Sequence, residues 1–225
     1  MFRSLRKVGL VGALLCALLV GAAAGSAHAA DIETDTSQEE TQGQTPASRL
    51  IEILDDRRLE ELDSDEVSAL ASLLAESGSI ALQILPDGTL AEMSPASSWG
   101  FAPLAVPEGT CEATTQGLWL RASSGYTQIG TKPTSECYHA AQYMRIATQF
   151  QAKHWWGYAN EGGPKVGQAW NTHKYTNTTS AQTPCANTLS TWWRATNEHY
   201  IIDYAGCPIL LYSATGAHQH KCGHQ

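Results

Sequence analysis

The chain has 225 residues, with 14 Lys and Arg against 22 Asp and Glu, and a formal net charge of −8. It contains no cluster of Lys and Arg, which argues against nucleic acid as a partner. The charge is divided, because residues 30–112 carry a net −15 whereas residues 113–225 carry +4 and most of the aromatic side chains. Since large apolar side chains build cores and contact surfaces, we expect the main globular domain in the second half.

Residues 1–29 have the pattern of a secretory signal peptide. Basic residues stand at positions 3, 6 and 7, an apolar run covers residues 8–25, and Ala27 and Ala29 are the small residues before a cleavage site. A membrane anchor is the alternative, but glycine and alanine dilute the second half of the run. No later stretch is long and apolar enough to span a membrane. We therefore expect a secreted, extracellular protein without a membrane span.

An acidic segment and a helical region follow the signal peptide. Residues 30–46 are polar and acidic without an apolar period, which predicts disorder. We expect a helical pair and a hairpin over residues 47–93. Leucine and isoleucine recur at helical spacing from Leu50 to Leu62, which predicts the first helix.

The second predicted helix has clear ends. Asp63 and Glu66 have the spacing of a capping box, and Gly78 is a typical stop. Residues 80–93 then alternate in polarity around a Pro-Asp-Gly turn, which predicts the hairpin. Prolines and glycines make residues 94–110 a linker. The acidic region is either a removable pro-region that masks the cationic half or a permanent part of the protein.

Residues 111–225 have the pattern of an antiparallel β-sandwich. Alternating polarity is clearest from Tyr143 to Trp156, where Met144, Ile146 and Phe150 share one face. This pattern predicts a strand with one buried face. Further expected strands cover residues 170–176, 189–196, 199–204 and 209–213. We expect a mainly β fold preceded by a short acidic α-helical region.

Five cysteines remain after the signal peptide, and a secreted protein meets an oxidising medium. Their spacing does not fix the connectivity. We predict one disulfide between Cys111 and Cys137 and a second between Cys185 and Cys222. Cys207 is then left as a buried spare.

Several short stretches carry a resemblance: residues 117–120, residues 125–133 with Cys137 after them, and the Trp155-Trp156 pair. Together they resemble small secreted β-rich proteins of Gram-positive actinobacteria that have no established function. The resemblance covers residues 111–222. It implies the β fold and the presence of disulfides, and it implies no activity and no catalytic residue.

Two tryptophan pairs, at residues 155–156 and 192–193, are candidate contact sites. Adjacent residues of a strand face opposite sides, so one member of each pair faces outward. The outward member of the first pair is Trp155, since it shares its parity with Lys153. Exposed aromatic rings bind sugars, lipids or proteins, unless another segment covers them. The candidate contacts are Trp155, Trp193, Tyr126 and Tyr158.

The end of the chain alternates His218, His220, Cys222 and His224. Imidazole and thiolate groups bind zinc, nickel or copper, and alternate residues of an extended chain share a face. The three histidines are therefore a candidate metal site, and a solvated, weakly chelating tail is the alternative. A disulfide at Cys222 would remove its sulfur as a ligand. We expect no cofactor.

These features favour a secreted, non-enzymatic binding protein that acts at a cell-surface or glycan target. The first alternative is an antimicrobial or toxin-like protein masked by its acidic pro-region. The second is an extracellular hydrolase that uses Glu161, Glu198 or His199, although the chain contains no catalytic motif and no catalytic residue is assigned. The sequence carries no indication of oligomeric state.

Overall fold

A computed structural model of the chain describes residues 44–55, 57–85, 87–93 and 110–224. The predicted signal peptide lies outside these ranges, as do most of the predicted acidic segment and nearly all of the predicted linker. The described residues form a mainly β protein of antiparallel strands, preceded by a short helical region, as predicted. Within these ranges no helix is long and apolar enough to cross a membrane.

The first helix, α1 (Pro46–Leu54), begins at a cap that the sequence supplies. The hydroxyl of Thr45 accepts the backbone N–H of Ser48, and Pro46 stands in the first turn. The helix ends where Asp55 adopts a left-handed conformation with a φ of 45°. The predicted continuation to Leu62 is therefore wrong, and a short 3-10 helix, η2 (Leu59–Glu61), follows instead.

The second helix, α2 (Ser64–Ser77), has the predicted capping box. The Asp63 carboxylate accepts the backbone N–H groups of Asp65 and Glu66, and the Glu66 carboxylate accepts that of Asp63. These bonds satisfy donors that the first turn of a helix leaves unpaired. Gly78, with a φ of 77°, ends the helix as predicted.

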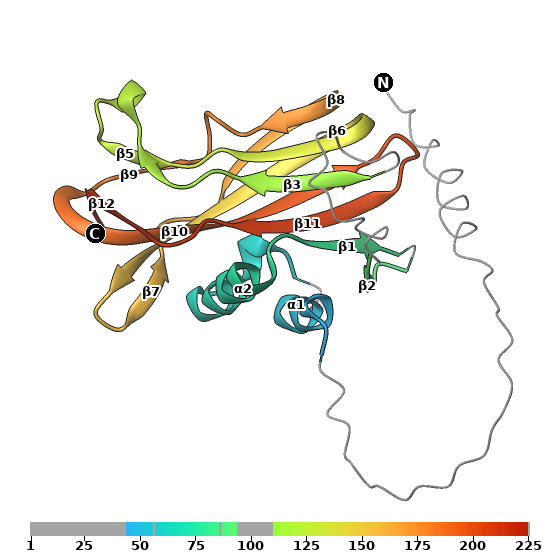
Figure 1. The fold of residues 1–225 in the computed structure, drawn as a ribbon, viewed down its shortest axis with the longest axis horizontal. Coiled ribbons are helices and arrows are strands. Elements are labelled where there is room, and N and C mark those ends of the chain that lie inside the picture. The colour runs from blue at the N-terminus through green and yellow to red at the C-terminus, as the bar shows by residue number, and fades with distance from the viewer. Residues whose placement is uncertain (1–43, 56, 86, 94–109, 225) are drawn as a thin grey trace, which may run out of the picture.

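The described residues contain two antiparallel sheets (Figure 1). The first has the order β2-β1-β11-β10-β6-β3, with β12 paired to β10 and with β7 and β8 paired to β6. The second has the order β4-β5-β9. The strands are β1 (Ile80–Ile84), β2 (Leu90–Glu92), β3 (Cys111–Thr115), β4 (Trp119–Leu120), β5 (Gln128–Gly130), β6 (Pro133–His154), β7 (Gly157–Asn160), β8 (Lys165–Thr176), β9 (Gln182–Pro184), β10 (Asn187–Ile202), β11 (Pro208–Ala214) and β12 (His218–Gly223).

Two predictions about the strands are wrong. The expected strands 189–196 and 199–204 are one continuous strand, β10. The polar residues in its middle suggest a loop between two strands. Asn197 and Glu198 are nevertheless both fully buried and form hydrogen bonds inside the protein. The histidine-rich end is also a strand, β12, rather than a solvated tail.

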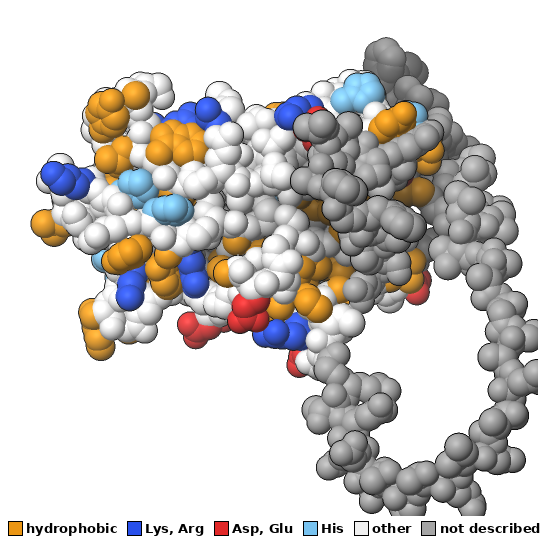
Figure 2. All heavy atoms as spheres, in the orientation of Figure 1, with side chains coloured by type: hydrophobic (Ala, Val, Ile, Leu, Met, Phe, Trp, Pro, Cys, Tyr) orange, Lys and Arg blue, Asp and Glu red, His pale blue; other side chains and the backbone are white. Residues whose placement is uncertain are grey.

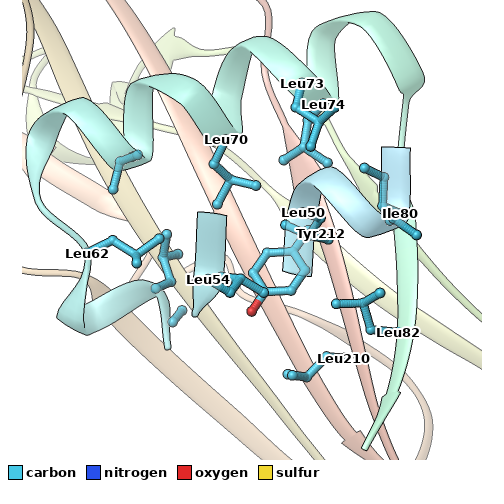
Figure 3. Close-up of a cluster of buried hydrophobic side chains, with 14 residues drawn as sticks. Leu50, Leu54, Leu62, Leu70, Leu73, Leu74, Ile80, Leu82, Leu210 and Tyr212 are labelled. Carbon is cyan, nitrogen blue, oxygen red and sulfur yellow. The ribbon is translucent and has the colours of Figure 1, made fainter. Parts of the chain in front are cut away.

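The strands form a sandwich with a helical layer outside it (Figure 1). Between the strand layers, the predicted inward residues Met144 and Phe150 are buried. On the opposite face of β10 and β11, leucines of α1 and α2 pack around Leu210 and Tyr212 (Figure 3). The polar side of β6, predicted to face solvent, is therefore covered as well. Gln151 is fully buried there and donates to the backbone oxygen of Ser64 at 2.9 Å.

The helical region also shares the main sheet, because β1 pairs with β11 along four residues, from Ile80↔Tyr212 to Gln83↔Ile209. Leu82 belongs to the same apolar cluster as the helices (Figure 3). Residues 46–93 and the C-terminal strands thus have one hydrophobic core in common.

A buried carboxylate ties the helical region to the sheet. Glu198 accepts the Arg58 Nε–H at 2.9 Å and the Leu59 backbone N–H at 2.9 Å. It also accepts the Tyr212 hydroxyl at 3.1 Å, and Arg145 Nη1 lies 3.3 Å from it. Burial alone would lower the pKa of Arg58, but the hydrogen bond and charge of Glu198 outweigh burial and raise it. The guanidinium of Arg58 therefore stays charged beside Glu198.

Both predicted disulfides, Cys111–Cys137 and Cys185–Cys222, are present. The first joins directly paired residues of β3 and β6, and the second fixes β12 beside the start of β10. No cysteine in the described ranges is free, so the prediction of a spare thiol at Cys207 is wrong.

A polar cluster lies between the strand layers around His199. The two ring nitrogens of His199 lie 2.9 Å from the hydroxyls of Ser135 and Ser213, on β6 and β11 respectively. Thr148 donates to the neighbouring Asn197 at 2.9 Å. Because the ring is fully buried, its pKa falls to about 3. The imidazole is therefore neutral at neutral pH, with one nitrogen donating and the other accepting.

Candidate functional site

The most exposed aromatic side chain in the described ranges, Trp155, lies next to Trp156 in the turn between β6 and β7, which we call the tryptophan turn (Trp155 and Trp156). His154 pairs with Gly157, so the turn contains only the two tryptophans. Trp155 is 92% exposed and Trp156 61%, and their rings lie nearly perpendicular at 5.2 Å. Hydrophobic side chains are visible at the end of this hairpin (Figure 2). The prediction that Trp155 faces outward is confirmed, but the strand ends at His154, which leaves both rings exposed.

The backbone does not require tryptophan at these positions. Two-residue turns favour Asn, Asp and Gly, whose small side chains tolerate unusual backbone angles. Here Gly157 takes the unusual conformation, with a φ of 143°, and neither tryptophan has a positive φ. The formation of the turn therefore does not explain why two exposed tryptophans stand at these positions.

A pocket of about 390 Å³ lies beside the tryptophan turn, between α2 and β7, and we call it the arginine pocket. Arg194 lies in it with its guanidinium 4.0 Å from the centre of the Tyr158 ring. Its Nε donates to Gln151 at 2.8 Å, whereas its Nη2 is buried without a hydrogen-bond partner. The lining residues are Ser64, Asp65, Ser68, Ser72, Trp156, Gly157, Tyr158, Ala159 and Arg194.

This arrangement combines apolar faces with directional polar groups. Tyr158 and Trp156 offer ring faces, the serines of α2 offer hydroxyls, and Arg194 offers an unused donor. Burial lowers the pKa of Arg194 from its usual value, but an arginine stays charged at neutral pH. Small-ligand pockets combine apolar faces with convergent polar groups. Here the polar side chains outnumber the apolar ones, a composition that suits a polar ligand.

A second group contacts Trp156, whose ring stacks on His154 at 4.4 Å and 24°. His154 Nε2 lies 3.2 Å from Glu161 Oε1, and His224 Nδ1 lies 3.9 Å from the same oxygen. Within the described ranges this is the single group of three His, Cys, Asp or Glu side chains arranged to hold a metal ion. A pocket of about 250 Å³ opens beside Glu161 and His224.

The predicted contact residues do not gather at one place. Tyr158 lies at the arginine pocket and Trp155 at the tip of the hairpin. Tyr126 is 63% exposed but precedes β5, in the layer opposite β7 (Figure 1). Trp193 is fully buried and donates its ring N–H to the backbone oxygen of Cys222, so its prediction as a surface contact is wrong. The outward member of that pair is Trp192, which is 43% exposed.

The predicted metal site of His218, His220 and His224 does not form. His218 and His220 lie on one side of β12 with their ring centres 6.3 Å apart. The strand ends at Gly223, and the ring of His224 instead lies 3.7 Å from that of His154. His220 is half-buried, and burial lowers its pKa.

Two of the three residues considered for a hydrolase are inaccessible. Glu198 and His199 are fully buried, and as neighbours in β10 they contact opposite faces of the sheet. Glu161, the third, is accessible at the smaller pocket. No family model, curated protein or solved structure matches the chain.

Proposed function

We infer that the protein is a secreted, non-enzymatic binding protein that attaches to a glycan of a cell surface through the tryptophan turn and the arginine pocket. The observation that carries this proposal is the exposure of two adjacent tryptophans, 92% and 61%, next to a pocket with an unpaired arginine donor. The signal-peptide pattern and the disulfides are compatible with an extracellular protein.

The chemistry of the surface fits a sugar better than a flat protein partner. Sugar rings present apolar C–H faces that stack on aromatic rings, and hydroxyls that exchange hydrogen bonds with serine, aspartate and arginine. A fully buried tryptophan removes about 150–250 Å² from water, and a ring that stacks on one face of a sugar buries part of that area at about 25 cal/mol per Å². The arginine pocket, at about 390 Å³, is within the usual size for a small ligand.

Replacement of Trp155 by Ala is expected to weaken binding to isolated Gram-positive cell walls by about 30-fold, equivalent to about 2 kcal/mol. The fold should be unaffected, because the side chain is 92% exposed. Co-sedimentation with cell walls, repeated with soluble glycan fragments as competitors, measures the affinity.

Trp170→Ala is the matched control, since Trp170 is 63% exposed but lies on β8 and packs on Tyr143. It should bind as the wild type does. Sedimentation that is equal for wild type, Trp155→Ala and Trp170→Ala would contradict the proposal. Binding to anionic lipid vesicles but not to cell walls would favour the antimicrobial alternative.

The antimicrobial alternative also requires removal of the acidic region. In the described residues that region covers Leu210 and Tyr212 and supplies β1 to the main sheet. We therefore expect the secreted form to retain residues 46–93. Intact mass and N-terminal sequencing of the secreted protein test this, and a mature chain that begins between residues 94 and 112 would support the masked toxin instead.

A further inference from the structure

We propose that His154, Glu161 and His224 form a zinc site with one open coordination position that faces the smaller pocket. The donor atoms are His154 Nε2, Glu161 Oε1 and His224 Nδ1, all within 4.8 Å of one another. The site is separate from the proposed glycan contacts of the arginine pocket, although Trp156 touches both groups.

The spacing of the three atoms suits a zinc ion. Bonds of about 2.0–2.1 Å at tetrahedral angles place two ligand atoms about 3.3 Å apart. The two distances to Glu161 Oε1 are 3.2 and 3.9 Å, on either side of that value. Rotation of the His224 ring toward Glu161 would shorten the longer of the two distances to the bonding geometry.

The ligands come from three separate places in the fold, as fixed metal sites usually require. His154 ends β6, Glu161 follows β7, and His224 follows β12. By contrast, His218 and His220 both lie on β12 and offer only two ligands on one side of a single strand. The convergence of three elements therefore distinguishes this group from a chelating tail.

Each ligand is held in place by its surroundings. The Glu161 backbone N–H donates to the Phe150 oxygen at 2.9 Å, and the ring of Trp156 stacks on His154. On the third element, the Ala186 N–H donates to the Gly223 oxygen at 2.8 Å, and a disulfide fixes Cys222, two residues before His224. Such support reduces the entropy lost when a metal binds.

The ligands are also reachable from solvent. The side chains of His154, Glu161 and His224 are 11%, 18% and 24% exposed. Glu161 and His224 line the pocket of about 250 Å³, together with Lys165. Three protein ligands with an open fourth position are the arrangement of zinc sites that bind a water or an exogenous ligand, and two imidazoles with one carboxylate suit zinc.

The alternative is that Glu161 only accepts a hydrogen bond from His154. Titration of the untagged, full-length mature protein with zinc by calorimetry distinguishes the two. We expect one zinc per chain with a dissociation constant at or below micromolar, and an X-ray absorption spectrum with two imidazole ligands. His154→Gln and His224→Gln should each weaken binding by at least about 100-fold, because loss of a supporting partner alone costs about 10–100-fold.

His218→Gln and His220→Gln are the matched controls, and both should bind zinc as the wild type does. No heat of binding at micromolar zinc would overturn the site, and so would binding that survives His154→Gln but is lost in His218→Gln. Circular dichroism checks that the variants fold. Co-sedimentation with cell walls in the presence of EDTA separates this proposal from the preceding one, since the tryptophan turn needs no metal to bind.

Discussion

Replacement of Arg58 by Met is expected to destabilise the protein by about 3 kcal/mol, since removing one partner of a buried ion pair leaves the other charge uncompensated. Glu198 is 0% exposed, and Arg58 provides two of its hydrogen bonds. The Leu59 N–H, the Tyr212 hydroxyl and Arg145 remain, which places the loss at the lower end of the usual range of about 3–5 kcal/mol. Urea denaturation measures the free energy of unfolding.

The neighbouring Arg57 is a matched control for this prediction. It pairs with Glu66 through two hydrogen bonds, but the two side chains are 37% and 29% exposed. Arg57→Met should therefore cost much less than Arg58→Met, because solvent screens an exposed ion pair. Replacing Arg58 and Glu198 together by Met should recover part of the loss, because Arg145 keeps its pair with Glu60. Equal losses for Arg57→Met and Arg58→Met would contradict a dominant buried pair.

The Arg58–Glu198 pair also changes the interpretation of the divided charge. A net −15 before residue 113 and +4 after it predict attraction between an acidic region and a cationic domain. The contact of Glu60 with Arg145 has that polarity. The pair of Arg58 with the fully buried Glu198 has the opposite polarity, because the acidic region provides the arginine and the cationic domain provides the glutamate. The contact between the acidic region and the cationic domain thus depends on the particular residues buried there, rather than on the net charge of each region.

Local features of the fold could be predicted from the sequence. The capping box at Asp63, the stop at Gly78 and the inward face of β6 depend on residues a few positions apart. The continuity of β10 could not be predicted, because the burial of Glu198 depends on Arg58, 140 residues away. A polar residue inside a strand pattern indicates a loop unless its distant partner is known.

The candidate site shows the same limit. Strand parity is enough to predict that Trp155 faces outward. The exposure of Trp156 as well depends on the two-residue turn, in which His154 pairs with Gly157. The grouping of His154 and Glu161 with His224 depends on where β12 lies on β10, which single-sequence patterns do not give. Arg194 was also missed, since its pocket exists only because α2 packs against β7.

His199 is expected to cost the protein about 2.5 kcal/mol of stability when the pH falls from 7 to 4.5. Its pKa in the folded protein is about 3, because the ring is fully buried, whereas an unfolded chain has a histidine pKa of about 6.5. The unfolded state therefore takes up a proton below about pH 6.5 that the folded state does not. The contribution of the neutral ring to the free energy of unfolding is complete above about pH 6.5. It declines by about 1.4 kcal/mol per pH unit as the pH falls toward 3.

Urea denaturation at a series of pH values measures this slope, and His199→Gln isolates it. The variant should be less stable than the wild type at pH 7, since it disturbs the bonds to Ser135 and Ser213, but its stability should fall less between pH 7 and 4.5. The exposed His173 is the control, and His173→Gln should keep the wild-type slope. The lowered pKa values of Glu66 and Asp87 also reduce stability in acid, but those carboxylates are present in both variants. If the stabilities of wild type and His199→Gln declined in parallel, the prediction would be contradicted, because the ring would then take up a proton in the folded protein. A protonated ring would require an anionic partner, which neither Ser135 nor Ser213 can supply.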